Sequence, residues 1–183
     1  YNERVLDRNV LNDDGSTLTQ GINALKKYGL CTETSWPYID DGVTFKTKPT
    51  NNCYTEANQH HVILATVINP KLTNLKNCLI AKLPFVVGIS IYESFESDNV
   101  ANTGIVPIPK REESLLGGHA VLCVGYDDSK QWFIMRNSWG DRWGDHGYFY
   151  IPYAYLTNRN LASDVWEIQK VTPEAIKKVA TIT

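Results

Sequence analysis

The chain has 183 residues, of which 43% are hydrophobic and 21% are charged, so it is long enough for one ordinary domain or for two small lobes around a cleft. Its formal net charge of −2 provides no broad basic field, and nucleic acid is therefore not expected as a primary partner. No apolar run approaches the ~20 residues that a membrane-spanning helix needs, so no membrane partner is expected either.

The chain begins at Tyr1, without a Met or a signal-peptide pattern. We expect this start to be an internal point of a longer product, for which cleavage, a second chain or a missing segment are alternative explanations. The four cysteines, Cys31, Cys53, Cys78 and Cys123, allow three complete disulfide pairings. Cys31 and Cys53 are interpreted as structural or disulfide-forming, with a partner for Cys53 outside this chain as one alternative.

In the first part of the chain, turn residues are followed by a helical pattern. The pattern predicts a helix that is capped by Ser16 or Thr17 and stops at Gly29. Residues 31–42 are predicted to be a loop because Pro and Gly interrupt them. Residues 43–60 are polar and rich in Asn, and we expect a long surface connection there.

The second part of the chain is predicted to be rich in strands around one crossover helix. In chain order the sequence predicts a strand at 61–68, a helix at 72–83, a buried strand at 84–92, irregular structure at 93–116, and further strands at 119–126, 131–138, 147–153 and 164–171, with a turn at 127–130. The tail, 172–183, is predicted to add a short surface helix.

A His and an Asn lie at the facing ends of two of these strands. His119 begins one strand and Asn137 ends the next, so an antiparallel pairing can place them side by side. The Asn amide oxygen would then accept from one imidazole nitrogen and leave the other to face a nucleophile, while Trp139 covers the hydrogen bond. The alternatives are a satisfied core histidine and a turn-forming asparagine.

Two segments resemble a known family. "GGHAVLCVGY" followed by "NSWGDRWGDHGY" resembles the His and Asn segments of papain-like cysteine peptidases, and the pattern N-S-W-G-x-x-W-G-x-x-G-Y matches at every fixed position. Upstream, "GSTLTQGINALKKYGLCTETSWPY" resembles the part of that family that follows its glycine-rich substrate strand. The resemblance covers residues 12–170.

The resemblance implies an α+β fold of the papain-like, two-lobe type. Residues 1–60 would form a partial left, helical lobe with its connection, residues 61–170 the right, β-barrel-like lobe, and residues 171–183 a C-terminal tail. The implied activity is that of a cysteine endopeptidase acting on peptide or protein substrates, with no cofactor and no metal.

The resemblance also implies roles for individual residues. His119 would pair with the nucleophilic thiolate and protonate the leaving amine, Asn137 would orient it, and Trp139 would shield both.

The resemblance also implies which residues contact the substrate. The carbonyl of Gly118 would hold the substrate backbone at P1, and Gly15 and Ser16 would pair with it at P2, although the family has Gly where this chain has Ser16. Asp164 lies where the family's S2 pocket ends, and an acid there would favour a basic P2 side chain. An ordinary surface aspartate is the alternative.

The sequence contains no obvious nucleophile. The family's Cys precedes its His by ~130–150 residues, and counting back from His119 passes Tyr1. Cys123 is expected to be a buried, inert thiol, since it lies roughly 13 Å along the same strand from His119. We therefore expect a preceding segment or chain to supply the Cys and the oxyanion-hole Gln, and this chain alone to be inert.

Other interpretations remain at this stage. The alternative function is a catalytically inactive papain-like protein that binds peptides or a partner, or that serves as a structural component. The adjacent His60 and His61 could suggest a metal site, but neighbouring strand residues point to opposite faces and no third ligand is evident. A structural zinc site is not expected because no Cys-x-x-Cys pair occurs.

Overall fold

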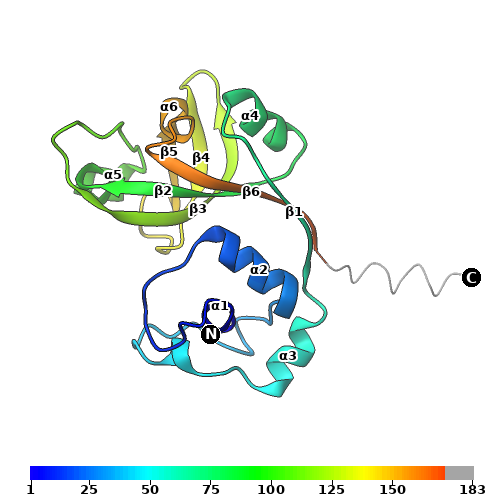
Figure 1. The fold of residues 1–183 in the computed structure, drawn as a ribbon. Helices are drawn as coiled ribbons and strands as arrows, with labels where there is room; N and C mark the ends of the chain where they lie inside the picture. Colours follow the sequence, from blue (N-terminus) through cyan, green and yellow to red (C-terminus); the bar gives the residue numbers. More distant parts are fainter. Residues whose placement is uncertain (172–183) are drawn as a thin grey trace, which may run out of the picture. The chain divides into compact units, whose positions relative to one another are not determined.

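The computed structural model describes residues 1–171, and the helix predicted for 172–183 lies outside them. The chain divides into two compact units, which are described here one at a time. The first contains Tyr1–Ala65 together with the described residues Ile168–Val171, and the second contains Thr66–Glu167. Helices dominate the first unit and a sheet the second, so the predicted α+β class is confirmed (Figure 1).

The first unit is built from short helices around one longer one. Its elements are α1 (Asn2–Leu6), α2 (Leu18–Tyr28), the 3-10 turn η1 (Thr44–Lys46) and α3 (Asn51–Ala57).

Helix α2 begins and ends where its capping residues predict. The Thr17 hydroxyl accepts from the Gln20 N–H, and the Gln20 side chain accepts from the Thr17 N–H, which forms a capping box. Gly29 ends the helix at φ 69°, a conformation that favours glycine.

The prediction of a surface connection over 43–60 is wrong, because the segment contains α3. Thr50 caps this helix, since its hydroxyl accepts from the Cys53 N–H, and the helix buries Cys53 and Ala57. A helix this short shows no apolar periodicity in the sequence, so its cap was the only local signal.

The first unit buries few side chains for its size. Its buried apolar residues within the described chain are Ile22, Ala24, Cys53, Ala57 and Val62. An apolar cavity of about 580 Å³ lies among α1, α2, the loop after α2 and α3.

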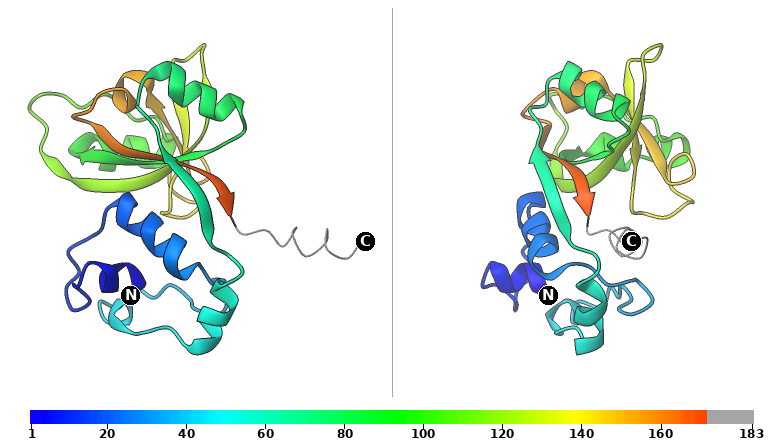
Figure 2. Two further views of the ribbon diagram at one scale, coloured as in Figure 1. Left: turned by 45° about the vertical axis from the view of Figure 1, so that its right-hand side comes forward. Right: turned by 90° about the vertical axis from the view of Figure 1, so that its right-hand side faces the viewer.

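The second unit contains a curved, open sheet with helices beside it (Figures 1 and 2). Its strand order is β1-β6-β2-β3-β4-β5, in which β1 and β6 also extend into the first unit. The elements are β1 (Val62–Val67), α4 (Leu72–Ile80), β2 (Phe85–Tyr92), η2 (Glu93–Glu96), α5 (Asp98–Thr103), β3 (Leu115–Asp127), β4 (Trp132–Arg136), β5 (Tyr148–Pro152), α6 (Tyr153–Leu156) and β6 (Ala162–Val171).

The core of this unit lies on one face of the sheet. In β2 every second side chain is buried, as the two-residue period of a strand requires. The opposing side chains come from α4 and from the neighbouring strands. Fully buried members include Leu75, Phe85, Val87, Cys123, Phe133, Met135, Phe149 and Ile151.

Most strands agree with the sequence prediction, but the region predicted as irregular does not. Helix α5 lies within 93–116, capped by the Ser97 hydroxyl, which accepts from the Val100 N–H. It ends at Gly104, whose φ of 70° and contact with Tyr148 leave no room for a side chain, since a Cβ would lie 2.8 Å from the Tyr148 carbonyl oxygen. Strand β3 also starts earlier than predicted, at Leu115 instead of His119.

Candidate active site

The strands β3 and β4 carry His119 and Asn137 to the same place. His119 lies inside β3, where it pairs with Ile89 of β2. Asn137 is the residue directly after β4, whereas the sequence predicted that it would lie at the end of this strand. The turn between the strands is held by the Asp127 carboxylate, which accepts from the N–H groups of Ser129 and Lys130.

A hydrogen bond joins the two side chains. Nε2 of His119 and Oδ1 of Asn137 are 2.8 Å apart, and both residues are half-buried. The backbone of Asn137 is itself fixed, because its N–H donates to the Gly147 carbonyl at 2.9 Å. The pair is therefore a positioned unit and not a chance surface contact.

The backbone after Asn137 decides which atom of the amide faces the imidazole. The Ser138 N–H points at the same amide atom at 2.8 Å, and a backbone N–H can only donate. That atom must therefore be the oxygen. Consequently Nε2 of His119 is the protonated nitrogen, and Nδ1 remains for a second partner.

The other end of the same amide has no partner in the described part of the chain. Nδ2 of Asn137 is buried and makes no hydrogen bond to any residue within 1–171. A buried donor left unpaired costs about 1–3 kcal/mol. The arrangement thus favours orientation of the imidazole over local stability.

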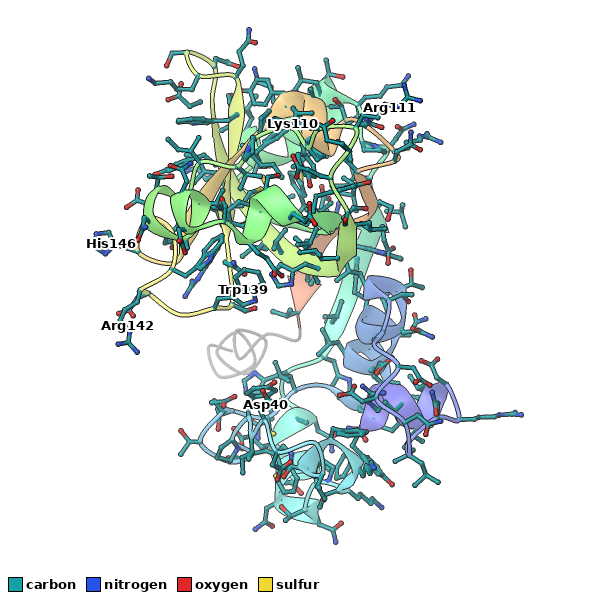
Figure 3. The ribbon with its side chains drawn as sticks, turned by 90° about the vertical axis from the view of Figure 1, so that its left-hand side faces the viewer. Asp40, Lys110, Arg111, Trp139, Arg142 and His146 are labelled. Atoms are coloured by element: carbon teal, nitrogen blue, oxygen red, sulfur yellow. The ribbon has the colours of Figure 1, made fainter. Side chains whose placement is uncertain are left out.

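Trp139 covers the imidazole. Its ring stacks on that of His119 with centroids 4.9 Å apart and planes at 29°. The indole is 41% exposed, and it lies on the loop that also carries Arg142 and His146 (Figure 3).

Trp139 also packs against a cluster of aromatic side chains. The Trp139 ring packs edge-to-face with Phe95 and with Trp143, with ring centroids 5.7 Å and 5.1 Å apart. Phe95 and Trp143 also pack on Phe149. Phe95 is buried in η2, and no sequence signal had pointed to it. Ser138 and Phe95 are thus the contributors that sequence reasoning missed.

The substrate-contact residues predicted from the sequence occupy two units. Gly118 lies in β3 next to His119, exposed, and pairs with Ser90. Gly15 and Ser16 lie in the first unit, in an exposed stretch just before α2, where Gly15 has φ 74° and the Ser16 hydroxyl donates to Glu3.

Asp164 lies in a β-bulge of β6. Trp166 pairs with Val86 and Ser163 with Gly88, so two residues of β6 oppose one of β2. Asp164 has φ 53°, a conformation that Asp tolerates better than most residues, and its carboxylate accepts from the Trp166 indole N–H at 2.7 Å. The bulge by itself accounts for an Asp at this position.

The cysteines of the second unit are buried and unactivated. Burial, and then the Glu167 carboxylate, raise the pKa of Cys78 to about 12. Burial also raises the pKa of Cys123, whose side chain is fully enclosed. Nucleophilic cysteines have lowered pKa values, so neither thiol has the required environment.

The structure also answers two further questions, on metal-binding groups and on membrane-spanning helices. The Nδ1 of His61 lies 3.0 Å from the Lys26 carbonyl oxygen. Within residues 1–171, no group of three or more His, Cys, Asp or Glu side chains is placed to hold a metal ion. Every helix in that part of the chain is too short or too polar to traverse a bilayer.

Comparison with known proteins places the chain in a family. Residues 7–166 match the model of the papain family cysteine proteases. An uncharacterized peptidase C1-like protein of Acanthamoeba polyphaga mimivirus is 40% identical over 96% of this chain and 58% of its own length. The cathepsin B-like cysteine proteinase 4 of Caenorhabditis elegans is 31% identical over 69% of this chain and 41% of its own length.

A solved structure agrees with these matches. Xylellain, a cysteine protease from Xylella fastidiosa, superimposes with a TM-score of 0.86 at 38% identity, covering 93% of this chain and 67% of xylellain. The chain thus spans only part of the length of these relatives, 58% of the viral one. It belongs to the papain family of cysteine proteases.

Proposed function

We propose that this chain supplies the base and the orienting residue of a cysteine endopeptidase. The observation that carries the proposal is the 2.8 Å contact of His119 with an Asn137 oxygen whose orientation the Ser138 N–H fixes. A base that is oriented by a third group, with its second nitrogen available, is the arrangement that activates a nucleophile in hydrolases of this kind.

In the proposed reaction, Nδ1 of His119 serves the nucleophile. The imidazolium stabilises a thiolate, whose sulfur attacks the carbonyl carbon of the scissile peptide and sends an electron pair to the carbonyl oxygen. Collapse of this intermediate expels the amine, which takes the proton from His119 and leaves a thioester. His119 then removes a proton from water, which hydrolyses the thioester and restores the thiolate.

The thiolate in this proposal comes from a segment that precedes Tyr1. Three of the four cysteines of the chain have raised pKa values, namely Cys31, Cys78 and Cys123, and the fourth, Cys53, is buried. The apolar cavity in the sparsely packed first unit also supports a further segment that completes its core. That segment would bring the Gln that, with backbone N–H groups, holds the oxyanion, a contribution of about 2.7–4 kcal/mol per donor.

The proposed substrate is a peptide or protein bound through its backbone. The Gly118 carbonyl would accept from the substrate at P1, and the exposed backbone at Gly15 and Ser16 would pair with it at P2. Asp164 would favour a basic P2 side chain.

The kinetic test compares variants of the complete protein, including the segment before Tyr1. For His119→Ala we expect kcat for a fluorogenic peptide amide to fall by at least about 10²-fold, the contribution of a general acid–base. For Asn137→Ala we expect a smaller loss, about tenfold, since one hydrogen bond is removed. The 183-residue chain by itself should show no hydrolysis.

Two results would overturn the proposal. If His119→Ala leaves kcat unchanged, the base is assigned wrongly. If the complete wild-type protein hydrolyses no peptide and still binds peptides, the chain belongs to an inactive binding protein of the same family.

A further inference from the structure

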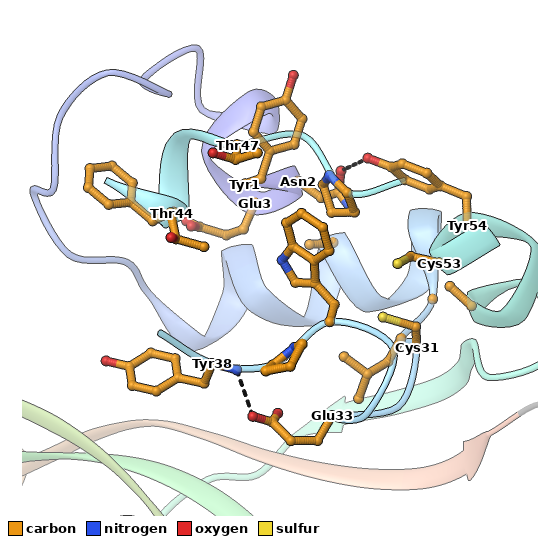
Figure 4. Close-up of a pocket in the computed structure, with 18 of the residues that line it drawn as sticks. Tyr1, Asn2, Glu3, Cys31, Glu33, Tyr38, Thr44, Thr47, Cys53 and Tyr54 are labelled. Carbon is orange, nitrogen blue, oxygen red and sulfur yellow. Dashed lines mark hydrogen bonds between the residues drawn. The ribbon is translucent and has the colours of Figure 1, made fainter. Parts of the chain in front are cut away.

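The first unit contains two neighbouring thiols. Cys31 lies in the loop that follows α2 and Cys53 lies in α3, and both face the apolar cavity of this unit (Figure 4). Figure 4 shows the two side chains next to each other at the wall of this cavity.

A set of hydrogen bonds already fixes this loop on α3. The Glu56 carboxylate of α3 accepts from the Thr32 N–H at 3.0 Å and from the Ser35 hydroxyl at 2.5 Å. The Cys53 thiol donates to the Ser35 carbonyl at 3.5 Å. The two Glu56 hydrogen bonds involve neither cysteine, so a disulfide would join two segments that are already held together.

The two thiols differ in their access to solvent. Cys53 is 3% exposed, whereas Cys31 is half-buried. Burial and then the neighbouring Cys53 thiol raise the pKa of Cys31, with the Glu56 carboxylate adding to the effect. An external reagent can thus reach Cys31 first, and the reaction needs an alkaline pH because only the thiolate attacks.

We propose that Cys31 and Cys53 are a redox-reactive pair that forms an intrachain disulfide with a low-molecular-weight disulfide such as oxidised glutathione as the oxidant. The Cys31 thiolate attacks one sulfur of the oxidant, which releases one glutathione thiolate and leaves a mixed disulfide. The Cys53 thiolate then attacks Sγ of Cys31 and releases the second glutathione. Two protein thiols are oxidised, and one glutathione disulfide is reduced to two thiols.

The disulfide would fix the loop 31–39 on α3 without taking part in peptide hydrolysis. It closes the chain between residues 31 and 53, and such a loop restricts the unfolded state. The inference is independent of the proposed peptidase function, and it excludes a partner for Cys53 outside this chain.

The test maps the disulfide in the complete wild-type protein. The protein is incubated with oxidised glutathione at about pH 8.5, blocked with iodoacetamide during unfolding, and digested with trypsin without reduction. Each of the four cysteines falls in its own tryptic peptide: 28–46 for Cys31, 47–71 for Cys53, 77–82 for Cys78 and 112–130 for Cys123. We expect peptides 28–46 and 47–71 to be joined, and the peptides of Cys78 and Cys123 to carry the blocking group.

Two outcomes would overturn the proposal: recovery of both Cys31 and Cys53 with the blocking group, or a bond from Cys53 to any other cysteine. A stability measurement gives a second readout. The oxidised protein should unfold about 10 °C higher than the reduced protein, and oxidation should not shift the unfolding temperature of Cys31→Ser or Cys53→Ser. An equal shift in these variants would contradict the pairing.

Discussion

At the scale of single residues, the Asn137 amide shows how a backbone group can set the chemistry of a side chain. The Ser138 N–H determines that the amide oxygen faces His119, and the oxygen in turn determines which imidazole nitrogen is protonated. Nδ2 of Asn137, which has no hydrogen-bond partner among residues 1–171, is the cost of this orientation.

Trp139 provides a prediction at this scale. Trp139→Ala removes the ring that stacks on His119 at 4.9 Å and exposes the His119–Asn137 hydrogen bond to water. In the complete protein we expect kcat/KM for a peptide amide to fall by about tenfold, since aromatic pairs contribute about 0.5–1.5 kcal/mol. Trp139→Phe, which keeps a flat ring, should recover most of the rate.

The matched control is Trp132→Ala. Trp132 stacks on Tyr150 at 4.8 Å at the other end of β4. Its loss should leave kcat/KM within twofold, and an equal loss in both variants would mean that Trp139 acts only through general stability.

The pairing of His119 with Asn137 was predictable because both residues lie in a dense motif on neighbouring strands. The contributions of Ser138 and Phe95 were not. The former acts through its backbone N–H, which every residue except proline has, and the latter reaches Trp139 only through tertiary packing. The Asp164 bulge likewise depends on the register between β6 and β2, which one strand alone does not determine.

At the scale of helices and strands, the cap of α2 can be tested by itself. Thr17→Ala removes the acceptor of the Gln20 N–H and should destabilise the helix by about 1 kcal/mol, which accelerates hydrogen exchange of the first α2 amides about fivefold. Thr17→Ser keeps the hydroxyl and should exchange like the wild type. Unchanged exchange in the Ala variant would show that tertiary packing alone holds this end of α2.

Tyr155 gives a second prediction at this scale. Its hydroxyl, in the short helix α6, donates to the Ser90 carbonyl of β2 at 2.6 Å, and burial raises its pKa to about 12. Tyr155→Phe should lower the free energy of unfolding by about 1–3 kcal/mol, because the part-buried Ser90 carbonyl loses the hydrogen bond from the buried Tyr155 hydroxyl. Urea unfolding measures this change.

Tyr150→Phe is the matched control for Tyr155→Phe. It removes an exposed hydrogen bond to Asp145 and should change the stability by at most about 0.5 kcal/mol. Equal effects in the two variants would contradict the account of α6.

The elements that the sequence predicted best are those whose apolar residues recur with a clear helical or strand period. Helix α2 and strand β2 each show one apolar face, and their bounds lie close to those expected. The short helices α1, α3, α5 and α6 were missed, because a helix of one or two turns shows little periodicity and depends on caps and tertiary contacts.

At the scale of the whole molecule, exposed carboxylates determine the response to acid. In five of them, hydrogen bonds hold the pKa below its ordinary value: Asp41, where it is about 2, and Glu56, Glu113, Asp127 and Asp128. Below about pH 5 the unfolded chain therefore binds more protons than the folded chain, and stability is lost progressively towards pH 2.

Asp128 allows a direct check of this pH dependence. The Lys76 ammonium and then the Tyr153 hydroxyl lower its pKa, so its contribution is present above the unfolded value of about 3.9 and disappears as the pH falls. Asp128→Asn should flatten the decline of the unfolding free energy between about pH 5 and pH 2. A decline as steep as that of the wild type would contradict this assignment.

Covalent labelling determines where the nucleophile of the proposed peptidase lies. The complete native protein is treated with a cysteine-directed epoxysuccinyl inhibitor, and the modified residue is mapped by mass spectrometry. We expect one label, on a cysteine that precedes Tyr1, and we expect this label to be lost in His119→Ala. A label on Cys31, Cys53, Cys78 or Cys123, or no label on the complete protein, would contradict this expectation.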